Sequence, residues 1–415
     1  MINIHTIIRK TFDKICCNYI FTKRSYCISK FKCFILFTLF CLNCYLVITP
    51  DHMFAKDVPE VKEILEKKID EKENIEENDN GKPSMKSFNI VGFPVILYQP
   101  ETSLMFGGGS AVTIRKKNER ANARPDNINV FAIYTLKNQI ALNINPDFYL
   151  NEENWELRVL MSYQKYPDTF FGIGNSNSED DAEDFTTEDI MIQPWLIHRV
   201  YKNLRIGMLY DFKKTNVLEI EENGLLSEQK LRGINGSLLS GFGPVLDWDT
   251  RNNIFYPSKG SWFQFYCAFY RNWLGSDFEY ESYTLDFRHY FCLPNSHILA
   301  VQLFGASLNG EITFNEFARL ANLRGINGSR FRDRKMVFAQ IEYRYPIYKR
   351  FSGVVFSAIG DVMNNVKDYD IRDLKYSVGL GLRFALNPDE RINLRFDVGI
   401  SRYGINPYFQ LSEAF

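Results

Sequence analysis

Few residues of this 415-residue chain have the types and spacings needed for covalent or metal chemistry. Five histidines are scattered, with no cysteine or carboxylate at the spacing of a metal site: His5, His52, His198, His289 and His297. No serine lies in a nucleophile elbow, and Gly107-Gly108-Gly109-Ser110 lacks the lysine of a phosphate loop. A run of acids is interpreted as a solvated loop rather than a divalent-cation site: Glu179, Asp180, Asp181, Glu183 and Asp184. We therefore predict no catalytic residue, no metal site and no cofactor.

The stretch Leu323-Arg324-Gly325 offers chemistry of another kind, that of an enclosed ion pair. It places a permanent cation beside a flexible glycine in a long loop. A guanidinium enclosed by protein needs carboxylate acceptors, because an unpaired buried charge is strongly destabilising. The same heptapeptide, LRGINGS, occurs twice, as residues 231–237 and 323–329, so Arg-Gly alone is not diagnostic.

The segments around that loop alternate in polarity with a period of two. Between Arg391 and Ser401 every odd position is polar or tiny and every even position is apolar, and a similar pattern runs from Leu374 to Leu386. Such alternation places one face of a strand in an apolar medium and the other in a polar one. These runs exceed the ~5–6 residues of soluble strands and match the ~9–11 residues that cross a bilayer at a tilt.

We predict an all-β fold, a 16-stranded antiparallel transmembrane β-barrel, with the even strand number of bacterial single-chain barrels. The predicted strands lie near residues 88–98, 103–115, 127–137, 139–150, 153–165, 186–200, 202–216, 236–249, 259–272, 278–292, 295–308, 334–346, 351–363, 374–386, 391–402 and 406–415. Long connections follow odd-numbered strands, at 166–185, 217–235 and 309–333. Because outer-membrane barrels place long loops outside, Arg324 is expected in an external loop and both chain ends in the periplasm.

Composition is compatible with this barrel and argues against other classes. The chain is 45% hydrophobic and 15% aromatic, with a mean hydropathy of −0.24, as expected when a barrel hides its apolar half in alternation. A formal net charge of −1 provides no basic surface for nucleic acid. A soluble sandwich or propeller is the alternative, but its strands are shorter and its outward residues are polar, whereas here they are Phe, Leu, Val and Tyr.

The N-terminal part is predicted to be a targeting segment followed by a linker. A basic flank precedes an apolar run at residues 34–49, and Phe54-Ala55-Lys56 then resembles a signal cleavage site, so residues 1–55 are assigned as the signal segment. Residues 56–87 are assigned as a charged linker, partly helical or disordered, and residues 88–415 as the barrel. Six of the eight cysteines precede residue 45, and the other two, Cys267 and Cys292, are out of phase and are not expected to pair.

Two further motifs lie in the strand-rich part. The predicted periplasmic turn 249–260 combines an acid, Arg-Asn, an aromatic residue, proline and glycine: Asp249, Arg251, Asn252, Phe255, Pro257 and Gly260. Asn and Gly allow unusual backbone angles there, and Pro stops further strand pairing. In the predicted last strand, Phe409, Leu411 and Phe415 share one face. A terminal aromatic residue on such a strand resembles the signal by which bacterial outer-membrane barrels are recognised for insertion.

The turn, the Arg324 loop and the four closing strands together resemble the barrel-assembly superfamily, the BamA- and TamA-like proteins also described as bacterial surface antigens. The resemblance implies that the loop folds back into the barrel and that acids on the following strands hold its arginine. Glu342 and Asp361 are the candidates, both expected to point into the lumen, so that Arg324 and Gly325 with one or both acids would pin the loop. The chain departs from the family pattern at Ile326, where an aromatic residue is usual, and after Asp361, where x-Gly is frequent.

The resemblance also implies a location, partners and a function. We expect a bacterial outer-membrane protein in contact with membrane lipids and lipopolysaccharide, inserting or exporting polypeptide by partial opening between its first and last strands. Unfolded polypeptides would be its clients. The family's periplasmic repeat domains are not seen in the sequence, so a separate periplasmic helper protein is expected. The alternative is a structural or passive-pore barrel without assembly activity. Neither hypothesis makes the chain an enzyme or gives it a nucleic-acid partner.

Overall fold

The computed structural model describes residues 87–99, 103–115, 126–222, 224–228, 230–387 and 391–415. The predicted signal segment, residues 1–55, and the charged linker, residues 56–87, lie outside the described residues except for Ser87, which opens the first strand.

Strands make up most of the described chain, in line with the alternating sequence. They are β1 (Ser87–Gln99), β2 (Ser103–Arg115), β3 (Asp126–Thr135), β4 (Ile140–Leu150), β5 (Trp155–Phe170), β6 (Glu183–Tyr201), β7 (Leu204–Ile220), β8 (Ser237–Asp249), β9 (Gly260–Tyr270), β10 (Tyr280–Cys292), β11 (Ile298–Gly310), β12 (Ala318–Arg319), β13 (Arg332–Asp333), β14 (Lys335–Tyr348), β15 (Phe351–Met363), β16 (Lys375–Asn387), β17 (Ile392–Ser401) and β18 (Gly404–Leu411). Short helical turns are α4 (Leu225–Glu228), η2 (Asn272–Leu274), η3 (Pro294–Ser296), η4 (Val366–Asp368) and η5 (Ile371–Asp373). No helix in these ranges is long and apolar enough to cross a bilayer.

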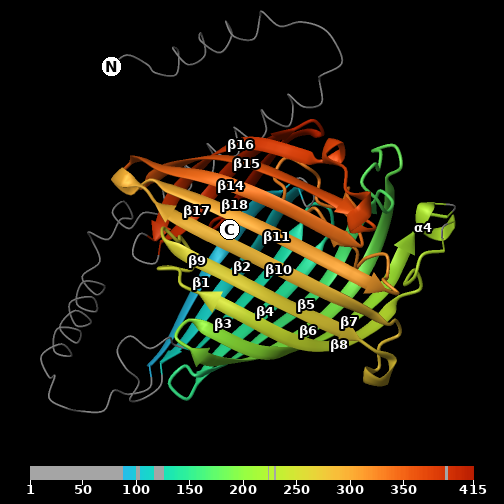
Figure 1. Cartoon of the computed structure of the whole chain (residues 1–415), viewed down its shortest axis with the longest axis horizontal. Coiled ribbons are helices and arrows are strands. Elements are labelled where there is room, and N and C mark those ends of the chain that lie inside the picture. Colours follow the sequence, from blue (N-terminus) through green and yellow to red (C-terminus); the bar gives the residue numbers. More distant parts are fainter. Residues whose placement is uncertain (1–86, 100–102, 116–125, 223, 229, 388–390) are drawn as a thin grey trace, which may run out of the picture. The chain divides into compact units, whose positions relative to one another are not determined.

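Sixteen of the described strands form one closed antiparallel barrel (Figure 1). Neighbours in the ring follow the chain from β1 to β11 and from β14 to β18, and β18 lies beside β1. β12 and β13 form a separate two-stranded sheet in the connection between β11 and β14. The predicted all-β barrel is confirmed, and the predicted bounds of residues 103–115 and 351–363 coincide with β2 and β15.

Alternation explains which side chains enter the barrel. On β16, Tyr376, Val378 and Leu380 are exposed on the outer face, while Ser377 and Arg383 are buried inside. On β17, Arg395 and Asp397 are buried inside and Ile400 is exposed outside, as the period-two pattern of that segment predicts.

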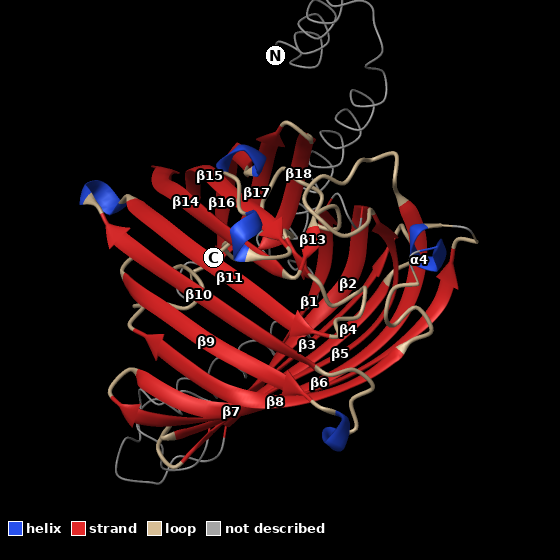
Figure 2. Ribbon diagram, turned by 45° about the vertical axis from the view of Figure 1, so that its right-hand side comes forward, coloured by secondary structure: helices blue, strands red, loops and turns tan. Residues whose placement is uncertain are grey.

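The interior is filled by the long connection 311–334, which passes within the ring of strands (Figure 2). Leu320, Leu323, Ile326 and Phe331 of this connection are buried against wall residues that include Phe338, Ala358 and Val362. The barrel therefore has an apolar interior at this level, formed by its own loop.

The seam between the first and last strands is the weakest junction in the described ring. The register of β1 with β18 joins a single residue pair, Tyr98 and Phe409, whereas β1 is paired with β2 along its whole length from Ser87 to Gln99. Each backbone hydrogen bond contributes about 1 kcal/mol net. Among the described residues, opening the ring between β1 and β18 therefore breaks fewer bonds than opening it between β1 and β2.

Candidate functional site

Arg324 lies inside the barrel between two carboxylates from different strands. Its Nη2 is 2.6 Å from Oε1 of Glu342 on β14, and its Nη1 is 2.6 Å from Oδ2 of Asp397 on β17. The guanidinium also stacks on the ring of Phe356, with 3.6 Å between Cζ and the ring centroid. The side chain is 6% exposed and both acids are fully buried, so the loop is tied to the wall by paired, largely buried charges.

The backbone after Arg324 is held as closely as its side chain. Gly325 has a φ of +100°, a left-handed conformation that favours glycine, and its N–H donates to the Tyr408 hydroxyl at 2.9 Å. The Ser401 hydroxyl donates to the Gly325 carbonyl oxygen at 2.6 Å. A Cβ on Gly399 would lie 2.6 Å from the Gly325 nitrogen, so the loop can rest on β17 only because residue 399 has no side chain.

A network of ion pairs surrounds the loop pin, which consists of Arg324 and Gly325 with their partners Glu342, Asp397 and Tyr408. Arg383 on β16 contacts Asp397 at 2.5 Å and Glu413 at 2.7 Å, and Arg344 on β14 contacts Glu342 at 2.9 Å. Weaker ion pairs join Arg383 to Glu342 at 3.9 Å and Arg344 to Glu413 at 4.0 Å. The network links β14, β16, β17 and the residues after β18. The strands on the β18 side of the seam are therefore joined to one another by ion pairs.

Of the two acids predicted as partners of Arg324, Glu342 pairs with it and Asp361 does not. Asp361 is fully buried but accepts from Nζ of Lys375 at 2.7 Å, at the start of β16. With Asp361 pointing inward, strict alternation would place Val354, Phe356, Ala358 and Val362 on the outer face of β15, which the structure contradicts. Val354, Phe356, Ala358 and Val362 face the interior and Val355 and Ile359 are exposed, because the apolar loop inside the barrel makes inward positions apolar too.

The periplasmic turn motif forms a set of local hydrogen bonds between β8 and β9. Arg251 holds Asp249 with two side-chain hydrogen bonds of 3.0 and 2.9 Å, and Oδ1 of Asn252 accepts from the backbone N–H groups of Ser258 and Lys259. Burial alone would lower the pKa of Arg251, but the Asp249 carboxylate outweighs it and holds that pKa above its usual value. Gly260 has a φ of +102°, and a Cβ there would lie 2.2 Å from the Thr250 carbonyl oxygen. Phe255 is partly exposed, whereas Pro257 is buried.

The chain end does not continue β18, contrary to the prediction of a last strand reaching Phe415. The strand ends at Leu411, and Ser412 turns the chain with a φ of +66°. An unbroken strand would have turned Glu413 to the lipid with Phe409 and Phe415, which is costly for a carboxylate. The turn instead brings Glu413 to Arg383 inside the barrel, where Asn393 also donates to it at 2.8 Å.

Phe415 follows Glu413 into the interior. Arg344 donates to the main-chain oxygen of Phe415 at 2.9 Å, and the phenyl ring is buried with Tyr290, Ile298 and Ala300. Phe409 remains on β18, opposite Tyr98. An insertion signal made of Phe409, Leu411 and Phe415 stays a prediction, but the buried ring of Phe415 is not on a lipid-facing surface of the folded chain.

The two copies of LRGINGS lie in different environments. Arg232 of the first copy is about half exposed and pairs with Glu311 at 3.2 Å, and its carbonyl oxygen accepts from the Phe314 N–H at 3.0 Å. The first copy therefore contacts the start of the loop that carries the second. What distinguishes Arg324 is burial between two acids, not the heptapeptide.

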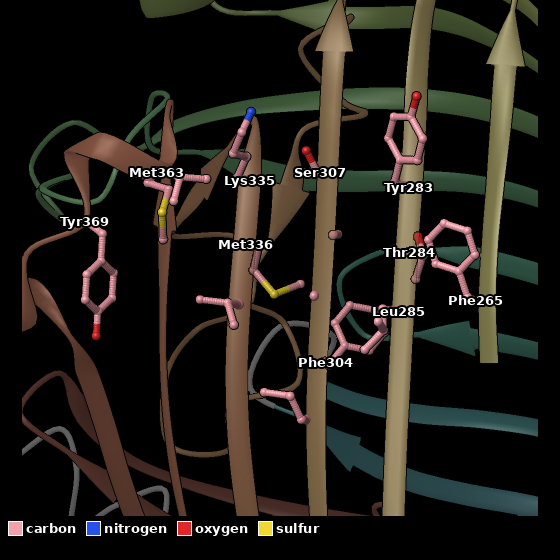
Figure 3. Close-up of a pocket in the computed structure, with 15 residues that line it drawn as sticks. Phe265, Tyr283, Thr284, Leu285, Phe304, Ser307, Lys335, Met336, Met363 and Tyr369 are labelled. Carbon is pink, nitrogen blue, oxygen red and sulfur yellow. The ribbon is translucent and has the colours of Figure 1, made fainter. Parts of the chain in front are cut away.

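An apolar recess of about 490 Å³ lies on the outer wall of the barrel (Figure 3). It forms where Gly305 contributes no side chain between its register neighbours Leu285 and Val337. Tyr283, Ser307 and Lys335 lie at one end of it. Its apolar walls fit a surface that faces lipid.

Several residues of the pin were not selected from the sequence. Asp397, Gly399 and Ser401 lie on the face of residues 391–401 that alternation predicts to be polar or tiny, so a signal for them existed. Arg383 lies in the same way on the polar face of residues 374–386. Tyr408 and Glu413 had no comparable signal, because their contacts depend on where the loop and the chain end fold. No group of three or more potential metal-binding side chains occurs in the described residues.

Comparison with known proteins identifies the architecture. No curated protein matches the chain. BamA from Haemophilus ducreyi, solved without POTRA domains 1–3, is 15% identical, with a TM-score of 0.57 over 79% of this chain and 70% of that one. CdiB from Acinetobacter baumannii is 10% identical, with a TM-score of 0.48 over 79% of this chain and 65% of that one. The Omp85 superfamily domain matches residues 106–412, well over half of the sequence. The chain thus belongs to the Omp85 superfamily of bacterial outer-membrane β-barrels, a family of outer-membrane protein insertion and polypeptide export.

Proposed function

We propose that this chain inserts polypeptides into the outer membrane, or exports them, by opening the seam between β1 and β18. The observation that carries the proposal is that the described parts of β1 and β18 pair at one position, Tyr98 with Phe409. A strand whose edge is unpaired presents a row of N–H and C=O groups, which another extended chain can pair with. A client strand could add to β1 in this way.

The turn at Ser412 enlarges that free edge. If β18 continued in its present register, residues 412–415 would lie opposite residues 92–95 of β1. They lie inside the barrel instead, where Glu413 and Phe415 are bound by Arg383 and Arg344. The described part of β18 therefore leaves the periplasmic half of β1 available for pairing.

The pin determines which side of the seam moves. Arg324 and Gly325 attach the loop to β14, β17 and β18 through Glu342, Asp397 and Tyr408. These contacts brace the last strands as one unit. We therefore expect opening to displace β1 and β2 while β14 to β18 keep their arrangement.

Depletion of the protein tests the proposal. Quantitative proteomics of the outer membrane after depletion should show a loss of specific other barrels or surface proteins, restored by the wild-type gene. An unchanged outer-membrane proteome would contradict the proposal.

A passive pore is the second candidate and has its own measurement. The loop 311–334 fills the described interior with buried Leu320, Leu323 and Phe331, and a pore would need it displaced. We expect little steady conductance in planar bilayers. A stable open channel of constant conductance would favour the pore.

A further inference from the structure

A polar cavity of about 330 Å³ lies inside the barrel, bordered by β5, the Arg324 loop, β17 and β18. Arg395 of β17 and Gln410 of β18 line it, and they lie directly opposite each other in the strand register. Asn322 of the loop and Asp168 of β5 line it from the other elements. The cavity is distinct from the pin, although Arg324 forms part of its wall.

In this cavity the guanidinium of Arg395 has too few hydrogen-bond acceptors. Its side chain is 7% exposed, and its Nε lies 3.7 Å from Oδ2 of Asp397, beyond hydrogen-bond distance. Asp397 already accepts from Arg324 at 2.6 Å and from Arg383 at 2.5 Å. Nε and Nη1 of Arg395 are buried and have no hydrogen-bond acceptor among the described residues.

The charges around Arg395 are not balanced by side chains. Within the described chain, the ion-pair network that includes it has the side-chain carboxylates of Glu342, Asp397 and Glu413, and Arg344 also donates to the main-chain oxygen of Phe415. Arg324, Arg344 and Arg383 each have an acidic partner, at 2.6, 2.9 and 2.5 Å respectively, whereas the ion pair of Arg395 with Asp397 is 3.7 Å long. The two other arginines on the cavity wall are paired, Arg319 with Asp168 at 2.9 Å and Arg324 with Glu342 and Asp397 at 2.6 Å. A buried guanidinium without an acceptor is costly, so the cavity favours one additional negative group.

We propose that this cavity is a carboxylate-binding site, with Arg395 as the charged ligand and the Gln410 side-chain amide as a neighbouring donor. A single negative charge matches the single unpaired guanidinium. A dianion such as phosphate would be repelled by the carboxylate of Asp168, which lines the same cavity. The carboxylate comes either from a free small acid or from a Glu or Asp side chain of a polypeptide inside the barrel, and both sources present the same chemistry to Arg395.

Thermal unfolding of the purified full-length protein in detergent tests the proposal, because a ligand that binds the folded state raises the unfolding midpoint. Sodium acetate should raise the midpoint saturably relative to sodium chloride at equal ionic strength. Arg395→Gln should weaken the acetate response at least about tenfold in concentration, as expected for loss of a charge-assisted hydrogen bond. Arg372→Gln is the matched control, because the Arg372 side chain is 84% exposed on an external turn, and it should respond like the wild type.

A second variant keeps the test decisive if Arg395→Gln does not fold. Gln410→Glu places a carboxylate opposite Arg395 within the chain itself. It should raise the midpoint without acetate and abolish the acetate response. An unchanged acetate response in both Arg395→Gln and Gln410→Glu, or no response in the wild type to any carboxylate, would overturn the proposal.

Peptides separate the two sources of the carboxylate. A capped Gly-Glu-Gly peptide is compared with its Gly-Gln-Gly counterpart in the same assay. Stabilisation by the Glu peptide at lower concentration than acetate assigns the site to polypeptide side chains. Stabilisation by acetate alone assigns it to small acids, and equal effects of the Glu and Gln peptides contradict recognition of a peptide carboxylate.

Discussion

Arg324 and Asp397 are 73 residues apart in the sequence and 2.6 Å apart inside the barrel. Their ion pair joins the loop 311–334 to β17, and Glu342 extends it to β14. The loop is thus fixed to strands on one side of the seam. Because the ion pairs of Arg324 attach the loop to β14 and β17, the loop can lie inside the barrel without holding β1 to β18.

Replacing the pinned arginine should release the loop. Arg324→Ala leaves Glu342 and Asp397 without one of their cations, and removing one partner of a buried pair costs about 3–5 kcal/mol. Heat-modifiable migration should shift, and proteolysis should reach the loop 311–334. Arg232→Ala in the first LRGINGS copy is the matched control, because its exposed pair with Glu311 contributes at most about 1 kcal/mol. Equal effects of the two substitutions would contradict the pin.

Asp397, the partner of Arg324 that the sequence did not indicate, can be tested against Asp361, the predicted candidate that does not pair with it. Asp397→Asn should expose the loop to protease, because it weakens bonds to both Arg324 and Arg383. Asp361→Asn should loosen the Lys375 contact without freeing the loop. Limited proteolysis with mass spectrometry locates the cleavage sites, and loop cleavage in Asp361→Asn alone would reverse the assignment.

A methyl group on Gly399 should displace the pinned backbone. In Gly399→Ala the added Cβ would lie 2.6 Å from the Gly325 nitrogen, so the loop must shift. We expect a lower unfolding midpoint and faster proteolysis of the loop. Gly305→Ala is the control, since its Cβ would find the nearest atom at 3.8 Å. A Gly399→Ala protein as stable as Gly305→Ala would show that the backbone contact is unimportant.

The buried chain end should contribute to the stability of the inserted barrel. Phe415→Ala removes a buried ring, and Phe→Ala changes in packed interiors cost about 3–5 kcal/mol. Denaturant unfolding in detergent measures the loss, with the partly exposed Phe255→Ala expected to cost less. A reduced membrane yield with unchanged stability would instead support a role confined to the insertion signal.

Much of the barrel can be predicted from the alternation of polar and apolar residues along the sequence. The contacts inside the barrel cannot be predicted in this way. Period-two patterning located the strands and the inward face of β17, because lipid and lumen impose opposite polarities on a single strand. It failed on β15, where Ala358 and Val362 face an apolar loop, so that polarity no longer separates inside from outside. It also failed after Leu411, because the turn at Ser412 depends on Arg383 and Arg344, which lie far away in the sequence. The two-residue strands β12 and β13 left no pattern long enough to read.

A cross-link across the seam tests the central claim most directly. With the native cysteines replaced by serine, Tyr98→Cys and Phe409→Cys place thiols on the paired residues of β1 and β18. Leu303→Cys with Ala339→Cys, paired between β11 and β14, is the control. Under oxidising conditions the seam cross-link should stop the insertion or export of client proteins, and a reductant should restore it, while the control pair has no effect. Normal client assembly with a fully oxidised seam would contradict opening between β1 and β18.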